Sequence, residues 1–203
     1  MTGPAEEIID LYSRRALDWD RDRGRDLAEK VWLDALLEEV PDGGSVLDLG
    51  CGSGEPIARY LVERGRKVTG VDAAPDMIAL CRRRFPDHDW RIADMRGLDL
   101  GRTFDGVIAW HSVFHLRPQD QRAMFAVYAR HVAPGGVLMF TSGTEAGEVV
   151  GDWRGEPLYH ASLSRADNRE RLDDAGFEPL IEPGPDPRIG EATVWLARAR
   201  IVR

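Results

Sequence analysis

A glycine-rich turn follows a short apolar run near position 50 of this chain. Residues 46–49 (VLDL) lead into Gly50, and two more glycines follow at Gly52 and Gly54. Glycine allows left-handed backbone conformations and close approach of a ligand, and a turn that opens a helix can direct N–H groups at that ligand. A simple tight turn needs only one or two glycines. The segment is therefore predicted to be a ligand-binding loop.

Acidic side chains stand at the ends of the next two segments with strand-like composition. Residues 67–71 (KVTGV) are followed by Asp72, and residues 90–95 (WRIADM) contain Asp94. A carboxylate at the end of the second strand of a βαβ unit can accept hydrogen bonds from both hydroxyls of a ribose. Taken singly, Asp72 could be a helix N-cap and Asp94 a turn residue. Their joint spacing behind the glycine loop favours a site for a nucleoside.

Two histidines follow the next predicted strand, residues 104–110. His111 comes directly after it, and His115 lies one helical turn further along. Because imidazole has a pKa near neutrality, it can take the proton from a hydroxyl that must act as a nucleophile, and we predict both residues as catalytic candidates. The alternative is that one ring packs beside the ligand and the other hydrogen-bonds a loop. No Ser-His-Asp order or paired carboxylates indicates a hydrolase.

The pattern G-x-G-x-G behind Asp48 resembles motif I of class I S-adenosylmethionine-dependent methyltransferases. Further segments of that family's core follow in order as far as about residue 142, including the turn 133–136 (APGG) and the strand-like residues 137–140. A dinucleotide fingerprint would instead need its third glycine at Glu55 or Ile57. The resemblance implies an α/β fold, a Rossmann-like three-layer αβα sandwich. Its sheet would be seven-stranded and mostly parallel, with an antiparallel C-terminal strand pair.

The resemblance also implies S-adenosyl-L-methionine as cofactor and S-adenosyl-L-homocysteine as product, with no metal. In this family the acid matching Asp94 accepts from the adenine amino group, and its neighbour Met95 packs on the ring. Cys51 also fits a purely structural role as a filler of small space between loop and helix. The residues that the resemblance assigns to the cofactor are Tyr12, Asp48, Gly50, Cys51, Gly52, Gly54, Asp72, Ala73, Asp94, Met95, Trp110 and His111.

The acceptor is expected to bind between an N-terminal helix and a later loop of the chain. In related small-molecule methyltransferases an N-terminal helix folds over the cofactor, which makes Tyr12 and Arg15 candidates to touch the cofactor's methionine end or the acceptor. Trp19 is expected to be an ordinary packing residue. Residues 143–160 contain four glycines and break the regular pattern. Long loops in compact domains are usually functional, and ligands bind beyond the carboxyl ends of parallel strands. We therefore predict an acceptor lid loop there, with substrate contacts from Trp153, Tyr159 and His160.

One domain, 1–203, is predicted from the length and from the continuous alternation of strands and helices. Its parts are an N-terminal helical cap (1–42), a cofactor-binding core (43–142), the acceptor lid loop (143–160) and a C-terminal helix with a strand pair (161–203). Helices are expected over 5–19, about 26–40, 118–132 and 164–175, and strands over 177–181 and 191–201. The second helix is expected to point Leu27, Val31, Ala35 and Leu36 inward.

The composition excludes several other classes of protein. The net charge of −8 argues against a nucleic-acid partner, because phosphate binding needs a basic face. No apolar run reaches the roughly 20 residues that span a bilayer, so no membrane partner is expected. The N-terminus does not resemble a signal peptide, and the two cysteines form no disulfide framework or metal-ligand spacing. We expect a cytoplasmic enzyme; a homodimer is left open.

The nature of the acceptor is the least determined feature. Trp110-His111-Ser112 stands where family members that methylate amino nitrogens of bases or glutamine often carry Asn-Pro-Pro-Tyr or Asp-Pro-Pro-Tyr. The expected function is methyl transfer to a small organic acceptor by in-line displacement, with a hydroxyl first and nitrogen or sulfur next. Two alternatives remain: a non-catalytic S-adenosylmethionine-binding module, and an NAD(P)-dependent oxidoreductase.

Overall fold

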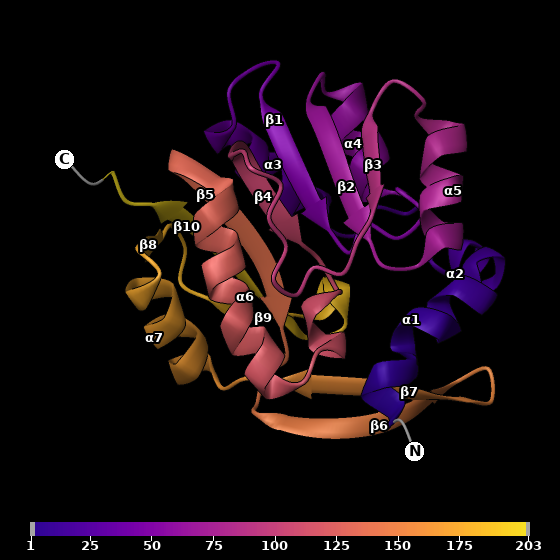
Figure 1. The fold of residues 1–203 in the computed structure, drawn as a ribbon. Helices are drawn as coiled ribbons and strands as arrows, with labels where there is room; N and C mark the ends of the chain where they lie inside the picture. Colours follow the sequence, from indigo (N-terminus) through magenta and orange to yellow (C-terminus); the bar gives the residue numbers. More distant parts are fainter. Residues whose placement is uncertain (1–2, 202–203) are drawn as a thin grey trace.

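Five parallel strands form the core of the computed structural model, which describes residues 3–201 (Figure 1). They are β1 (Ser45–Leu49), β2 (Lys67–Asp72), β3 (Asp89–Ile92), β4 (Phe104–Ala109) and β5 (Val132–Ser142). Their order in the sheet is β3-β2-β1-β4-β5. The chain therefore starts at the centre and builds outward in both directions, which opens a crevice beyond the carboxyl ends of β1 and β4.

The C-terminal strands complete the sheet on the far side of β5. Strand β10 (Ala192–Ala199) runs antiparallel to both β5 and β8 (Phe177–Pro179), which confirms the predicted fold class. A strand that was not predicted, β9 (Gly184–Asp186), also pairs with β10 and leads into the 3₁₀ turn η2 (Pro187–Ile189). Its proline- and glycine-rich sequence indicates only a turn, because the pairing is imposed by the free edge of β10.

Helices cover both faces of the sheet and make three layers. On one face α3 (Lys30–Glu39), α4 (Ile57–Glu63) and α5 (Pro75–Arg84) bury apolar side chains such as Leu36, Leu61 and Ile78. On the other face α6 (Pro118–His131) and α7 (Arg165–Asp174) contribute Met124 and Leu172. The structure thus confirms the predicted helices near 118–132 and 164–175. No helix among residues 3–201 is long and apolar enough to cross a membrane.

The N-terminal helices differ from the prediction in their breaks and their phase. The single helix expected over 5–19 is divided at Arg15 into α1 (Pro4–Arg14) and α2 (Ala16–Asp22), so that α2 can turn toward the glycine loop. The helix expected from about 26 begins only at Lys30, because Leu27 has a left-handed backbone (φ 49°). Val31 is consequently exposed and Leu33 is buried. Since α3 packs on the sheet, the cap consists of α1 and α2 rather than residues 1–42.

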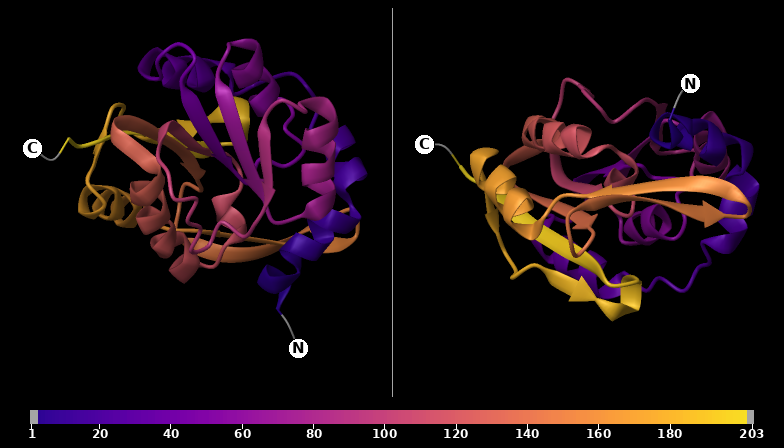
Figure 2. Two further views of the ribbon diagram at one scale, coloured as in Figure 1. Left: turned by 45° about the horizontal axis from the view of Figure 1, so that its top comes forward. Right: turned by 90° about the horizontal axis from the view of Figure 1, so that it is seen from below.

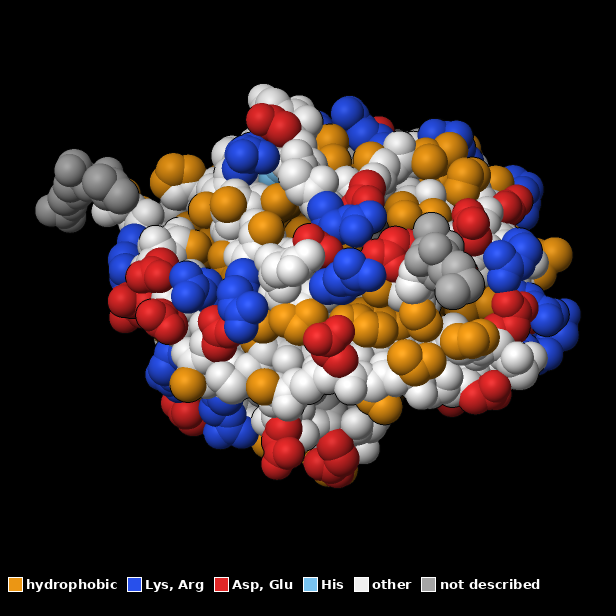
Figure 3. All heavy atoms as spheres, turned by 60° about the horizontal axis from the view of Figure 1, so that its bottom comes forward, with side chains coloured by type: hydrophobic (Ala, Val, Ile, Leu, Met, Phe, Trp, Pro, Cys, Tyr) orange, Lys and Arg blue, Asp and Glu red, His pale blue; other side chains and the backbone are white. Residues whose placement is uncertain are grey.

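The predicted irregular lid loop over 143–160 is wrong in its secondary structure. The segment forms a β-hairpin of β6 (Gly147–Trp153) and β7 (Glu156–Ser162), which reaches under the cap (Figures 1 and 2). Arg154 and Gly155 connect the strands with positive φ angles of 56° and 81°, the left-handed conformation that two-residue hairpin turns require. Apolar, basic and acidic side chains are interspersed on the face that carries the hairpin (Figure 3).

Candidate functional site

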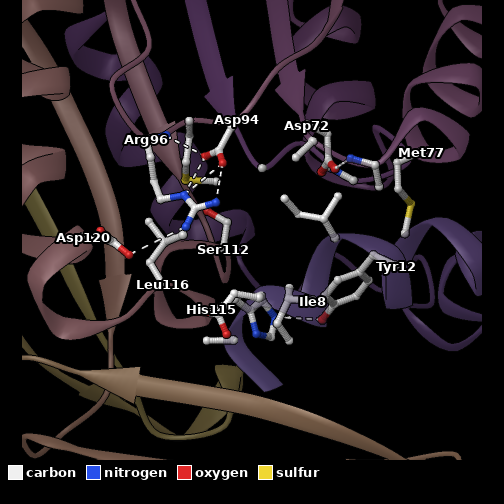
Figure 4. A pocket seen from close by; sticks show the side chains of 18 of the residues that line it. Ile8, Tyr12, Asp72, Met77, Asp94, Arg96, Ser112, His115, Leu116 and Asp120 are labelled. Atoms are coloured by element: carbon white, nitrogen blue, oxygen red, sulfur yellow. Dashed lines mark hydrogen bonds and ion pairs between the residues drawn. The ribbon is translucent and has the colours of Figure 1, made fainter. Parts of the chain in front are cut away.

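A cavity of about 350 Å³ lies beyond the carboxyl ends of the central strands and beneath α1 (Figure 4). Its walls are formed by the glycine loop, the ends of β2 and β3, the segment after β4, and the cap. Nine of the 17 predicted site residues line it: Tyr12, Gly50, Gly52, Asp72, Ala73, Asp94, Met95, His111 and His115. Residues that sequence reasoning missed or treated as packing also line it, among them Ile8, Trp19, Met77, Arg96, Ser112 and Asp120.

The glycine loop makes room in the cavity wall. Gly50 and Gly52 have φ angles of 76° and 53°. A Cβ atom on Gly50 would overlap Ser112 Cβ, and one on Gly52 would lie 3.0 Å from the ring of Trp19. Contrary to the prediction, the backbone N–H groups of Gly50 and Cys51 are not directed at a ligand, because both donate to Val71 O, at 2.8 and 3.1 Å. Gly50 and Gly52 contribute to the cavity through close approach.

Asp72 retains free hydrogen-bonding capacity toward the cavity. Its Oδ2 accepts from Gly52 N and its Oδ1 from Ala74 N, each at 2.9 Å. A carboxylate offers about four acceptor positions, so each oxygen keeps one for a ligand. Burial raises the pKa of Asp72 above its ordinary value, and the two backbone hydrogen bonds oppose that rise. The arrangement fits the expected grip on two ribose hydroxyls.

Four predicted cofactor residues lie behind the cavity wall. Asp48 is 2% exposed, and no hydrogen bond reaches its carboxyl from residues 3–201. Burial, and secondly the charge of Asp72, raise its pKa to about 7. Gly54 faces Phe85, Cys51 is a buried thiol, and the buried indole N–H of Trp110 has no partner in the described part of the chain. For Asp48 this follows from the sheet, because β1 directs alternate side chains to opposite faces.

His111 presents an unengaged imidazole to the cavity. Its backbone is left-handed (φ 48°), which is uncommon outside glycine, and its N–H donates to Thr141 Oγ1 at 2.9 Å. The ring nitrogens have no hydrogen-bond partner among the described residues. Burial, and secondly the charge of Arg23, lower the pKa of His111 to about 4. The ring is therefore neutral near pH 7, with a lone pair available to a ligand.

His115 has both ring nitrogens engaged within the protein. Nδ1 lies 2.8 Å from the carbonyl oxygen of Tyr159, and Nε2 lies 2.8 Å from the hydroxyl of Tyr12. Since a carbonyl can only accept, Nδ1 carries the proton and Nε2 accepts from Tyr12. Burial is the main cause that lowers the pKa of His115 to about 4. The ring thus joins the cap to the hairpin and positions the Tyr12 hydroxyl, which leaves it no free lone pair for an acceptor.

The predicted substrate contacts brace the cavity from outside. Arg15 pairs with Glu156 at 2.9 Å, and Trp153 stacks on Tyr12 with ring centroids 6.2 Å apart. The Tyr159 hydroxyl donates to Glu148, and the ring of His160 packs 4.9 Å from that of His115. Arg14–Glu156 and Arg154–Asp22 ion pairs add to this fastening of cap to hairpin. No sequence signal indicates the contacts between cap and hairpin, because their partners are more than a hundred residues apart.

The lowered pKa of His115 predicts how stability depends on pH. Its folded pKa of about 4 lies below the ordinary 6.5, so folding favours the neutral ring. This stabilisation is complete above pH 6.5 and is lost as the pH falls toward 4. Between pH 7 and 4.5, urea unfolding should show wild type losing about 2–3 kcal/mol relative to His115→Gln. A constant difference between the two proteins over that interval would contradict the assignment.

Sequence comparison places the cavity in a known family of domains. Residues 46–136 match the model of a methyltransferase domain. A dTDP-3-amino-3,4,6-trideoxy-alpha-D-glucopyranose N,N-dimethyltransferase of Streptomyces venezuelae is 33% identical over 121 residues, covering 58% of this chain and 51% of the relative. A trans-aconitate 2-methyltransferase of Azoarcus sp. is 37% identical over 107 residues, covering 51% of this chain and 41% of the relative. The chain spans about half the length of the curated relatives it matches.

Solved structures agree with the fold. Magnesium protoporphyrin IX methyltransferase from Synechocystis superimposes with a TM-score of 0.75 at 19% identity, covering 97% of this chain and 100% of that one. The 1,6-didemethyltoxoflavin-N1-methyltransferase of Burkholderia thailandensis gives 0.73 at 22% identity, covering 98% and 92%. The sequence matches, the strand order and the glycine loop all agree with the predicted family. The prediction of the family and of its cofactor class is therefore confirmed. The match over residues 46–136, the relatives and the fold together support a class I S-adenosylmethionine-dependent methyltransferase.

Proposed function

We propose that this chain transfers the methyl group of S-adenosyl-L-methionine to a small organic acceptor. The observation that carries the proposal is one cavity that contains both the open carboxylate of Asp72 and the unengaged imidazole of His111. The first is a grip for a ribose, and the second is a group that can receive a proton. A cavity that only stored the cofactor would have no need of the second group.

The residues present fit the cofactor. Gly50 and Gly52 supply space that any Cβ would fill, Asp72 supplies two acceptor positions for the ribose, and the apolar Met77 and Met95 line the same cavity. S-adenosylmethionine, when bound, supplies a methyl group activated on a sulfonium. The chain's own contribution is positional, since holding two reactants in line can be worth roughly 7–11 kcal/mol.

The cap and the hairpin would keep water from the reacting groups. Tyr12 and Ile8 of α1 cover the cavity, and the bond from Tyr12 to His115 ties this cover to the segment after β4. His111 would accept a hydrogen bond from the acceptor group, at whichever of its ring nitrogens faces that group. The hairpin of residues 147–162 is proposed as the acceptor-side wall in place of the loop first expected.

We propose an amine as the acceptor group to test first. A histidine with a pKa near 4 is a weak base, so removing a proton from an alkyl hydroxyl would be steeply uphill. A neutral amine is already nucleophilic and needs only a hydrogen-bond acceptor that orients it. The relatives named for amino-sugar N,N-dimethylation favour the same choice. The hydroxyl that the sequence suggested is the second candidate, best represented by an acidic phenol.

Calorimetric titration followed by an acceptor screen tests this function. We expect S-adenosylmethionine and S-adenosylhomocysteine to bind and NADH not to bind, and S-adenosylhomocysteine to be released when amino sugars or small aryl amines are added. Binding without turnover on any amine or phenol would support the non-catalytic module. Binding of NADH alone would overturn the cofactor assignment.

Replacing Asp72 with alanine should weaken S-adenosylhomocysteine binding by about 10²–10⁴-fold. The loss corresponds to two hydrogen bonds to a charged acceptor at about 1.5–3 kcal/mol each. Asp72→Asn should give an intermediate loss, because its amide oxygen can still accept. Asp89→Ala removes an acid of β3 that does not line the cavity and should leave affinity unchanged. Unchanged affinity in a folded Asp72→Ala protein would remove the ribose assignment.

A further inference from the structure

The carboxylate expected to receive adenine is already occupied by an arginine. Asp94 Oδ1 accepts from Arg96 N at 2.9 Å and from Arg96 Nε at 3.0 Å. Its Oδ2 lies 2.9 Å from the same Nε and 2.5 Å from Nη2 (Figure 4). Three N–H groups of Arg96 therefore occupy the carboxylate, with the Nε–H shared by both oxygens. Because a carboxylate has about four acceptor positions in all, at most one remains for an exocyclic amino group while the pair is intact.

The contrast with Asp72 shows that this occupation is specific. Asp72 also lines the cavity, but each of its oxygens accepts a single backbone N–H and keeps one position open. The hydrogen bonds from Arg96 outweigh burial and hold the pKa of Asp94 below its ordinary value. Asp94 is thus an ionised acceptor most of whose hydrogen-bonding capacity is used by Arg96, two residues away.

A second carboxylate, that of Asp120, lies close to the guanidinium of Arg96. Arg96 Nη1 lies 3.8 Å from Asp120 Oδ2 on the first turn of α6, and Arg96 and Asp120 both line the cavity. Glu6 of α1 also acts electrostatically on Arg96. At 3.8 Å the pair with Asp120 is an ion pair without a good hydrogen bond. A small rotation of the long Arg96 side chain would convert it into one while releasing Asp94.

We propose that Arg96 is a displaceable counter-ion that competes with adenine for Asp94, and that cofactor binding moves its guanidinium toward Asp120. The inference rests on the proposed function and names a determinant of purine recognition within it. Partly exposed ion pairs contribute about 0.2–1 kcal/mol, so the competition is strong enough to tune affinity and weak enough to be reversed by a ligand. Arg96 does not weaken the binding of a purine that carries a hydrogen-bond acceptor at position 6, because the guanidinium can donate to that acceptor.

Binding of two ligands to a set of matched variants tests the proposal. The ligands are S-adenosylhomocysteine and S-inosylhomocysteine, which has an oxygen in place of the amino group. Arg96→Gln should tighten S-adenosylhomocysteine binding by about two- to fivefold and should not tighten S-inosylhomocysteine binding. Asp120→Asn should weaken S-adenosylhomocysteine binding in the wild-type background and have no effect in the Arg96→Gln background.

Arg91 provides a matched control for the substitution. It pairs with Asp89 in the same i, i−2 arrangement, with Nε 3.2 and 3.0 Å from the two carboxylate oxygens, but does not line the cavity. Arg91→Gln should leave both affinities unchanged. Weaker or equal binding of S-adenosylhomocysteine to folded Arg96→Gln would overturn the inference and leave the proposed function standing. Failure of the wild-type protein to bind S-adenosylhomocysteine would overturn both.

Discussion

Replacement of His111 with alanine is expected to lower kcat by about 10–100-fold while S-adenosylhomocysteine affinity stays within about twofold, because it removes one hydrogen bond of about 1.5–3 kcal/mol that orients the acceptor. The imidazole lines the cavity without a hydrogen-bond partner in the described part of the chain, so its loss removes no internal contact of comparable strength. Because its pKa is lowered to about 4, the acid limb of kcat/KM should fall near that pH rather than near 6.5. Steady-state turnover and calorimetry on the same preparation measure the two effects.

His160→Ala is the matched control for this experiment. His160 is half-buried near the same cluster, where its ring packs on Phe114 and His115, but it does not line the cavity. We expect a loss of turnover below tenfold for this variant. Equal losses of turnover and affinity in His111→Ala would show a packing role, and no loss of turnover would remove His111 from the mechanism.

A methyl group on Gly50 should destabilise the protein by about 3 kcal/mol or more and abolish cofactor binding. The left-handed backbone at φ 76° costs roughly 1–2 kcal/mol for any other residue. The added Cβ would also overlap Ser112 Cβ and lie 3.1 Å from Met95 Cε, so the loop or the segment after β4 must shift. Urea unfolding of Gly50→Ala against wild type measures the first effect, and calorimetry with S-adenosylhomocysteine measures the second.

Gly65→Ala separates the two causes. Gly65 has nearly the same backbone angle, φ 74°, but a Cβ there would meet nothing within 4 Å. The free energy of unfolding of Gly65→Ala should fall only by the cost of the left-handed backbone, roughly 1–2 kcal/mol, and the variant should bind the cofactor normally. Equal destabilisation by the two substitutions would mean that close packing at Gly50 contributes nothing beyond the backbone angle.

The cofactor half of the site could be predicted because its signals are local. Apolar runs that end in glycine or aspartate mark where parallel strands stop, and those carboxyl ends converge on one edge of a sheet. Gly50, Asp72 and Asp94 therefore meet at the cavity as expected. The same reasoning placed Asp48 and Trp110 correctly at strand ends. It did not predict that both side chains lie behind the cavity wall, because the face of the sheet that a side chain takes depends on the pairing register.

The acceptor half could not be predicted in the same way. The segment 143–160 indicated a loop because its glycines interrupt periodicity, yet the two left-handed residues Arg154 and Gly155 fold it into a hairpin. Its contacts with the cap join residues far apart in the chain, such as Arg15 with Glu156. Nothing in a local pattern specifies pairs of this kind.

The sequence by itself determined the fold class, the family and the residues that meet a nucleoside, because strand ends and glycine spacing are properties of short segments. Only the tertiary structure decided what the ionisable groups do. Burial makes His111 neutral, and closure of the cap on the hairpin engages both ring nitrogens of His115. These states depend on solvent exclusion and on partners up to a hundred residues away, so they exist only once the chain has closed around them.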